Sequence, residues 1–99
     1  MKGAMGMLGL CARAGRLISG EQMALKAIRS GKVYLALIDA GASANAKKAI
    51  IDACTSHQVD WFEVSEGQLG GAIGKPERMV AGITDRGFAE QLKIRLESN

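Results

Sequence analysis

The segment from Val33 to Ile38 is apolar at every position, and no other feature of the sequence constrains the fold as strongly. A strand with one face in water alternates apolar and polar side chains, whereas an uninterrupted apolar run is typical of a strand buried on both faces. Such strands lie in the middle of a sheet that helices cover on both sides. Because 99 residues is the size of one small domain, we predict a single domain over residues 1–99.

The segments on either side of this strand alternate between helical and extended patterns. Apolar residues at helical spacing predict helices that end near Ala14, span residues 20–30, follow Ser43, include Leu69 to Ile73, and follow Thr84 or Asp85. Further extended segments are predicted at residues 16–19, 59–64 and 78–83. This alternation predicts an α/β fold, a three-layer α/β/α sandwich with a small four-stranded mixed sheet, and it leaves the strand order open.

Two of the predicted helix starts carry the sequence pattern of a capping box. Ser19 is followed three residues later by Gln22, and Ser65 is followed in the same way by Gln68. In a capping box the serine hydroxyl accepts a hydrogen bond from the third residue of the helix, whose side chain reaches back to the serine. We therefore expect Ser19 and Ser65 to cap the helices that follow them.

The charge of the chain is unevenly distributed along the sequence. The formal net charge is +3, but residues 1–32 hold six basic residues and one acidic residue, whereas residues 33–66 hold two basic and five acidic residues. A concentration of positive charge in one part of a small domain is typical of a surface that binds polyanions. Arg13, Arg16 and Arg29 belong to this basic part and are expected to attract such a partner at long range.

The common nucleotide-binding motifs are absent. The segment Gly70 to Lys75 resembles a phosphate-binding loop, but position 69 is a leucine where the first glycine is required, and Lys75 is followed by Pro76 instead of serine or threonine. The residues after the buried strand, Asp39 to Ser43, lack the glycine pattern of a dinucleotide-binding turn. The sequence therefore predicts no nucleotide cofactor.

The remaining reactive side chains form no recognisable catalytic or metal site. Cys11 and Cys54 are far apart in the sequence and lack the spacing of a zinc or redox motif, so we expect them to be small buried residues in a reducing compartment. His57, the only histidine, is expected at the end of a helix. Asp39 ends the buried strand, where functional carboxylates of α/β folds often lie, but it has no identifiable catalytic partner. We predict no metal and no enzymatic activity, with catalysis at Asp39 as the weakest alternative.

The amino-terminal segment only partly resembles an export signal. Lys2 precedes an apolar stretch, but Gly6 and Gly9 interrupt it, and Leu10 stands before Cys11 where lipoprotein signals need a small residue. The stretch is also shorter than the roughly 20 residues that span a membrane. We therefore predict a cytoplasmic protein without a membrane partner, and a monomer, because no heptad pattern is present.

Two predicted loops have the composition of nucleic-acid contacts. Gly20, Glu21 and Gln22 bring backbone amides and short polar groups to a helix start, and Lys26 follows one turn later. Such a helix start suits phosphates and exposed base edges. The segment from Lys75 to Met79 is a stiff, partly basic connection into a strand, and its methionine offers an apolar surface to an extruded base.

Residues 19–83 resemble the ribosomal protein L7Ae/L30e family and its bacterial relatives. The matching segments are Gly20 to Gly31, the buried strand through Ala40, and Leu69 to Gly74 before the last strand. The chain looks most like the short bacterial members of the YlxQ type, which share Gly15-Arg16 and the tail from Thr84 to Ala89. This family binds kink-turn RNA, a bent element with an internal loop. The resemblance therefore implies a structured RNA partner, from ribosomal or messenger RNA, and an association with the ribosome or translation factors.

The resemblance assigns RNA contacts to particular residues of this chain. In the family, a loop at the helix start reads the guanine–adenine pairs of the kink, a lysine one turn later supports it, and apolar residues after the glycine-rich helix cover a flipped nucleotide. Together with the basic residues of the two loops, the predicted RNA-binding set is Gly20, Glu21, Gln22, Lys26, Arg29, Lys75, Arg78, Met79 and Val80.

Two departures from the family pattern, at Gln22–Met23 and at Glu66, support a different function. Gln22 and Met23 stand where the family usually has asparagine and glutamate, and a thioether cannot replace a carboxylate that accepts from guanine. Glu66 stands where several relatives carry lysine. The alternative is a protein-interaction module of the same fold that has lost specific RNA binding.

Overall fold

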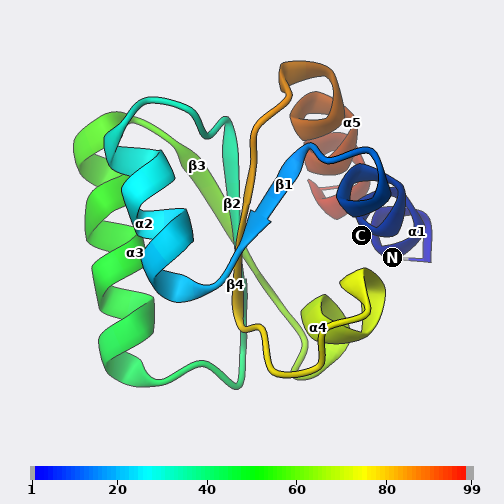
Figure 1. Cartoon of the computed structure of the whole chain (residues 1–99), viewed down its shortest axis with the longest axis horizontal. Coiled ribbons are helices and arrows are strands. Elements are labelled where there is room, and N and C mark those ends of the chain that lie inside the picture. The colour runs from blue at the N-terminus through cyan, green and yellow to red at the C-terminus, as the bar shows by residue number, and fades with distance from the viewer. Residues whose placement is uncertain (1, 98–99) are drawn as a thin grey trace.

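The computed structural model describes residues 2–97 and shows helices and strands in strict alternation (Figure 1). The helices are α1 (Lys2–Arg13), α2 (Glu21–Arg29), α3 (Ala44–His57), α4 (Gln68–Ile73) and α5 (Arg86–Glu97). The strands are β1 (Leu17–Ser19), β2 (Leu35–Asp39), β3 (Asp60–Val64) and β4 (Val80–Ile83). Every predicted element is present, with boundaries that differ by a few residues.

The four strands form one mixed sheet in the order β1-β4-β2-β3. β2 pairs in parallel with β3 and antiparallel with β4, and β1 pairs antiparallel with β4. All five residues of β2 are buried, which confirms the prediction from the apolar run. Tyr34 is an exception, because it precedes the strand and is 44% exposed, with the guanidinium of Arg86 over its ring.

Helices cover both faces of the sheet, so the predicted three-layer sandwich is confirmed. α2 and α3 lie on one face, and α1, α4 and α5 lie on the other (Figure 1). Successive side chains of β2 point to opposite faces: Leu35 and Leu37 pack under α1 and α5, whereas Ala36 and Ile38 pack under α2 and α3. The run is apolar at every position because both of its faces lie in a hydrophobic core.

The two predicted capping boxes are wrong. Ser19 is the last residue of β1 and pairs with Ala81, so its backbone belongs to the sheet, and Gly20 takes the N-cap position of α2. Gly67 is the N-cap of α4 in place of Ser65, with a φ of 85° that favours glycine. Ser43, by contrast, caps α3 through a hydrogen bond from the Ala46 amide.

The last helix begins as predicted. Asp85 accepts a hydrogen bond from the Phe88 amide at 2.9 Å, and this pairing identifies Asp85, of the two residues considered, as the cap of α5.

Asp39 is fully buried at the end of β2 and connects three parts of the chain. The Gly41 amide donates to its Oδ1 at 2.8 Å, and the Gly67 amide donates to its Oδ2 at 2.9 Å. Its own amide donates to the carbonyl oxygen of Met79. Because both carboxylate oxygens accept from backbone amides and no part of the residue is exposed, Asp39 acts as a structural connector out of reach of a substrate.

We expect neither cysteine to react with iodoacetamide in the folded protein at neutral pH. Burial, with a smaller effect of the Asp85 charge, raises the pKa of Cys11 to about 11, and burial with the charge of Asp60 raises the pKa of Cys54 to about 11. At pH 7 only about one thiol in ten thousand is then ionised, and the thiolate is the reactive form. The raised pKa values also make the folded state lose stability as the pH rises above 9, because the thiols of the unfolded chain ionise at a lower pH than those of the folded protein.

Mass spectrometry after alkylation, with and without denaturant, measures this protection. Labelling of the native protein at the rate of a free thiol would contradict the burial of both side chains. The cysteines are in different cores, so each reports on the opening of one face of the sheet.

Three further features of the described residues concern metal ligands, membrane-spanning helices and the histidine. Within residues 2–97, no three His, Cys, Asp or Glu side chains gather into a group that could hold a metal ion. The same part of the chain contains no helix with the length and apolar character needed to cross a membrane. His57 is exposed in the last turn of α3, which agrees with the prediction that it lies at the end of a helix.

Candidate nucleic-acid interface

The two predicted loops meet at one end of the sheet, where β1 runs into α2 and the chain enters β4. The Gly20 amide donates to the carbonyl oxygen of Val80 at 2.9 Å, directly beside the pairing of Ser19 with Ala81. A cleft of about 280 Å³ opens there, and we call it the Gly20 cleft. It is lined by Gly20, Glu21, Gly41, Ala42, Ser43, Ala46, Glu77, Arg78, Met79 and Val80.

The conformation of Gly20 explains why a glycine is required at this point. Its φ is 100° and its ψ is 142°, a region that side chains other than hydrogen rarely tolerate. A Cβ atom at Gly20 would also collide with Nη1 of Arg78. The absence of a side chain therefore allows the Arg78 guanidinium to lie directly against the backbone at the start of α2.

The segment before β4 forms a tight turn. The Arg78 amide donates to the carbonyl oxygen of Lys75 at 2.9 Å, which closes a four-residue turn with Pro76 in its second position. Proline fits there because its fixed φ matches the turn. Arg78 lines the Gly20 cleft, but Lys75 does not. The turn therefore separates two basic residues that the sequence placed in one loop.

Arg78 has only a weak partner in the cleft. Its Nε lies 3.5 Å from a carboxylate oxygen of Glu77 without forming a hydrogen bond, and this Nε is buried with no other partner within residues 2–97. Its side chain is 37% exposed, and a pair of this length at a surface contributes little. No hydrogen bond or ion pair within residues 2–97 involves the Nη atoms of Arg78, so these atoms can donate to an anionic ligand such as a phosphate.

Met79 and Val80 contribute to the cleft in different ways. Met79 is half-buried and packs against the core beneath α2 and α3. Val80 is almost fully buried, so its backbone lines the cleft while its side chain belongs to the core. Of the two, Met79 presents the apolar surface.

The outer face of α2 adjoins the cleft and carries the remaining basic residues. A hollow of about 420 Å³ is lined by Glu21, Gln22, Leu25, Lys26, Arg29 and Ser30. Gln22, Lys26 and Arg29 are exposed, and within residues 2–97 no ion pair involves either of the two cations. We call this surface the α2 face, and Glu21 belongs both to it and to the cleft.

The structure divides the nine predicted residues into three groups. Gly20, Glu21, Arg78, Met79 and Val80 lie together in the Gly20 cleft. Gln22, Lys26 and Arg29 lie beside them on the α2 face. Lys75 lies apart, in a groove on the other side of the turn.

One wall of the cleft was missed by sequence reasoning. It consists of Gly41 to Ser43 and Ala46, from the loop after β2 and the first turn of α3. The only signal for this wall was its position after the carboxyl end of a buried strand, where loops of α/β folds commonly form binding sites.

The cleft also contains negative charge. Glu21 and Glu77 line it, and Cγ of Glu66 lies 3.0 Å from where a Cβ of Gly41 would be. Met23 does not line the cleft but is 59% exposed on α2. Both departures from the family pattern are therefore at the surface, and Glu66 lies at the edge of the cleft itself.

The family model described as the ribosomal protein L7Ae/L30e/S12e/Gadd45 family matches residues 4–93. The chain belongs to this family. The resemblance noted in the sequence is confirmed, and the match includes every residue of the Gly20 cleft and the α2 face.

Two bacterial proteins are similar to this chain over most of their length. The RNA-binding protein YlxQ of Bacillus subtilis (strain 168) is 40% identical over 87 residues, which is 87% of each chain. The RNA-binding protein YlxQ of Enterococcus faecium is 41% identical over 95 residues, covering 95% of this chain and 91% of that protein.

Solved structures show the same L7Ae/L30e fold. A protein of unknown function from Bacillus halodurans C superposes with a TM-score of 0.91 at 38% identity, over 95% of this chain and 96% of that one. The 15.5kD RNA binding protein of Giardia lamblia superposes with a TM-score of 0.74 at 20% identity, over 95% and 84% of the two chains. The second likeness concerns the fold alone.

Proposed function

We propose that this protein is a non-catalytic RNA-binding protein of translation, which recognises a kink-turn or a similarly bent, internally looped RNA. The observation that carries the proposal is the approach of Arg78 to the bare backbone of Gly20, beside Lys26 and Arg29 of the α2 face, which form no ion pair with any described residue. Two relatives that are at least 40% identical bear the name RNA-binding protein, which supports the same conclusion.

Each part of the site suits one feature of a bent RNA. The Gln22 side-chain amide is exposed at the start of α2 and offers both a donor and an acceptor to a base edge. Lys26 and Arg29 supply charge for the phosphates that a sharp bend brings close together. Met79 offers an apolar surface to a nucleotide that has left the stack.

The experiment that tests the proposal compares a kink-turn RNA with a straight duplex of equal charge, in magnesium at near-physiological salt. We expect the protein to prefer the kink by about a hundredfold, or about 2.7 kcal/mol. We expect Lys26→Ala to weaken binding to the kink about tenfold, because one phosphate contact is lost. The logarithm of the affinity should fall linearly with the logarithm of the salt concentration.

A matched control is Lys48→Ala, which removes an equal charge from the exposed side of α3. Its affinity for the kink should equal that of the unmodified protein. Unchanged binding in Lys26→Ala would place the RNA on another face, and an affinity that does not depend on salt would exclude phosphate recognition.

The second candidate function is a protein-interaction module of the same fold. Met23 is an exposed apolar residue on α2, and Glu66 adds a negative charge at the edge of the Gly20 cleft. Equal, weak binding to the kink and the duplex would favour this function over RNA recognition.

For either function we propose that the protein is a monomer and is cytoplasmic. Sedimentation experiments can check the oligomeric state, and cell fractionation can check the location.

A further inference from the structure

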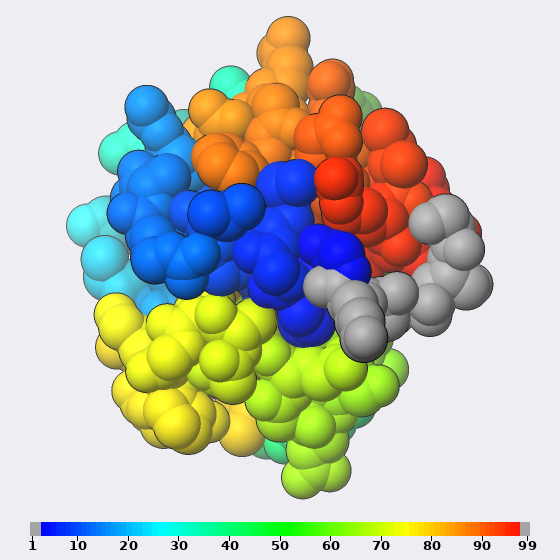
Figure 2. Space-filling model, turned by 90° about the vertical axis from the view of Figure 1, so that its right-hand side faces the viewer, coloured from blue at the N-terminus to red at the C-terminus, as the bar shows by residue number. Residues whose placement is uncertain are grey.

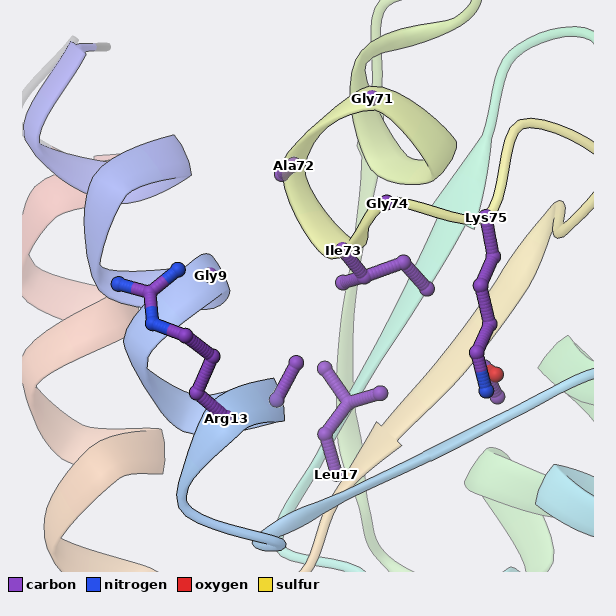
Figure 3. Close-up of a pocket in the computed structure, with 10 residues that line it drawn as sticks. Gly9, Arg13, Leu17, Gly71, Ala72, Ile73, Gly74 and Lys75 are labelled. Carbon is purple, nitrogen blue, oxygen red and sulfur yellow. The ribbon is translucent and has the colours of Figure 1, made fainter.

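Another hollow lies on the other side of the Lys75–Arg78 turn, between the end of α1, β1 and the end of α4. Its volume is about 440 Å³, and we call it the α1–α4 groove. Figure 2 shows the surfaces of α1 and α4 side by side on this face of the molecule, and Figure 3 shows the residues between them. Glycine and alanine make up half of its lining.

The groove carries positive charge at both of its sides. Arg13 from α1 stands on one side and Lys75 on the other, with Leu17 and Ile73 between them (Figure 3). Both cations are exposed, and within residues 2–97 no hydrogen bond or ion pair occupies either side chain. None of the described residues that line the groove is acidic. The groove is therefore more favourable to an anion than the Gly20 cleft, because two acidic residues, Glu21 and Glu77, line that cleft.

Leu17 and Ile73 give the groove an apolar patch between the two cations. Leu17 and Ile73 are half-buried residues at the surface of the core beneath α1 and α5. An apolar floor with a cation on either side matches an unstacked nucleotide, whose base has an apolar face and whose neighbouring phosphates are anionic. A duplex does not match, because stacking hides the faces of its bases.

The groove and the Gly20 cleft are next to each other. Ser19 lines the groove and Gly20 lines the cleft, so the two surfaces are separated by one peptide bond at the end of β1. On the other side, the hydrogen bond between Arg78 and Lys75 closes a turn, which holds the Cα atoms of these residues within about 7 Å of each other. An RNA strand that leaves the cleft at Arg78 reaches the groove at Lys75 by crossing this turn.

We propose that the α1–α4 groove binds a single-stranded RNA segment that continues from the bent element, with Arg13 and Lys75 holding phosphates on either side of a base on Leu17 and Ile73. This inference rests on the proposed function for its ligand, and it adds a second site with a different chemistry. The bent element is recognised by its shape in the cleft, and the flanking strand by its charge and exposed bases in the groove.

The test uses a kink-turn RNA with and without a single-stranded extension of about six nucleotides. For the unmodified protein we expect the extension to raise affinity about tenfold, through added phosphate and base contacts. We expect the Arg13→Gln, Lys75→Gln double variant to lose this gain, so that it binds the RNA with and without the extension equally well. Both residues are exposed, so the substitutions leave the fold intact.

The matched control is the Lys32→Gln, Lys48→Gln double variant, which lowers the net charge equally at exposed positions outside the groove. It should retain the full gain from the extension. If the control variant and the groove variant lost the same part of the gain in affinity, the gain would depend on net charge alone, and the proposal would be overturned. An extension that adds no affinity to the unmodified protein would also overturn it.

A second measurement separates this inference from the proposed function. In a titration with the single-stranded oligonucleotide by itself, followed by amide resonances, we expect the signals of Gly71, Gly74 and Lys75 to shift. If these signals shift while the protein shows no preference for the kink over the duplex, the groove stands and the proposed function fails. If they stay unchanged while the kink is preferred, only the groove proposal fails.

Discussion

Asp39→Ala is expected to lower the free energy of unfolding by about 4 kcal/mol, since two hydrogen bonds to a charged acceptor are lost and each contributes about 2 kcal/mol. The substitution leaves the amides of Gly41 and Gly67 without their acceptor in the folded protein. A domain of this size has a total stability of about 5–15 kcal/mol, so the variant approaches the limit of folding. Urea denaturation followed by circular dichroism measures the change.

Asp52→Ala is the matched control for this prediction. Asp52 is an exposed aspartate on α3, and its only described bond is the surface pair with Lys48. We expect it to change stability by no more than about 0.5 kcal/mol. A similar small change in Asp39→Ala would show that the buried carboxylate does not hold the loop after β2 and the start of α4 together.

Gly70→Ala is expected to lower the free energy of unfolding by about 3 kcal/mol, the upper part of the usual range for a group forced into a packed site. Gly70 is buried in α4, and a Cβ there would lie 2.7 Å from the Lys75 carbonyl oxygen and 2.8 Å from Cα of Pro76. These are backbone atoms, so the whole turn must move. Thermal and urea denaturation measure the loss.

Gly70→Ala is also expected to weaken RNA binding in the molecules that remain folded, because the displaced turn carries both Lys75 and Arg78.

Gly71→Ala, in the same helix, is the control for the predicted loss of stability. A Cβ at Gly71 has no neighbour within 4 Å, so alanine should leave stability unchanged or raise it by up to about 1 kcal/mol through its helix propensity. An equal change in the free energy of unfolding for Gly70→Ala and Gly71→Ala would contradict the close approach of α4 to the turn.

Much of the fold was predictable because its strongest signal is hydrophobic periodicity. The apolar run of β2 and the helical spacing in α3 result from burial, which the sequence records directly. Strand order was not predictable, since β1 pairs with β4 through contacts between distant parts of the chain. The capping boxes were wrong for a related reason: Ser19 takes part in that sheet pairing, and glycines with positive φ begin α2 and α4.

The candidate site was predictable in composition but only partly in arrangement. The sequence indicated the basic and small residues of both loops, and the structure brings five of the nine together in the Gly20 cleft. It could not indicate that the Lys75–Arg78 turn directs its two cations to different surfaces, because this depends on a hydrogen bond within the turn. The wall from Gly41 to Ser43 was missed because small residues after a strand carry no chemical signal of their own.

The hydrogen bond between Gly20 and Val80 also determines when the cleft can exist during synthesis of the chain. The ribosome makes Gly20 early, with the start of α2, but the carbonyl that accepts its hydrogen bond is made only with β4. Arg78, which lies against Gly20, is made equally late. A nascent chain therefore has no cleft until β4 has left the exit tunnel and can pair with β1.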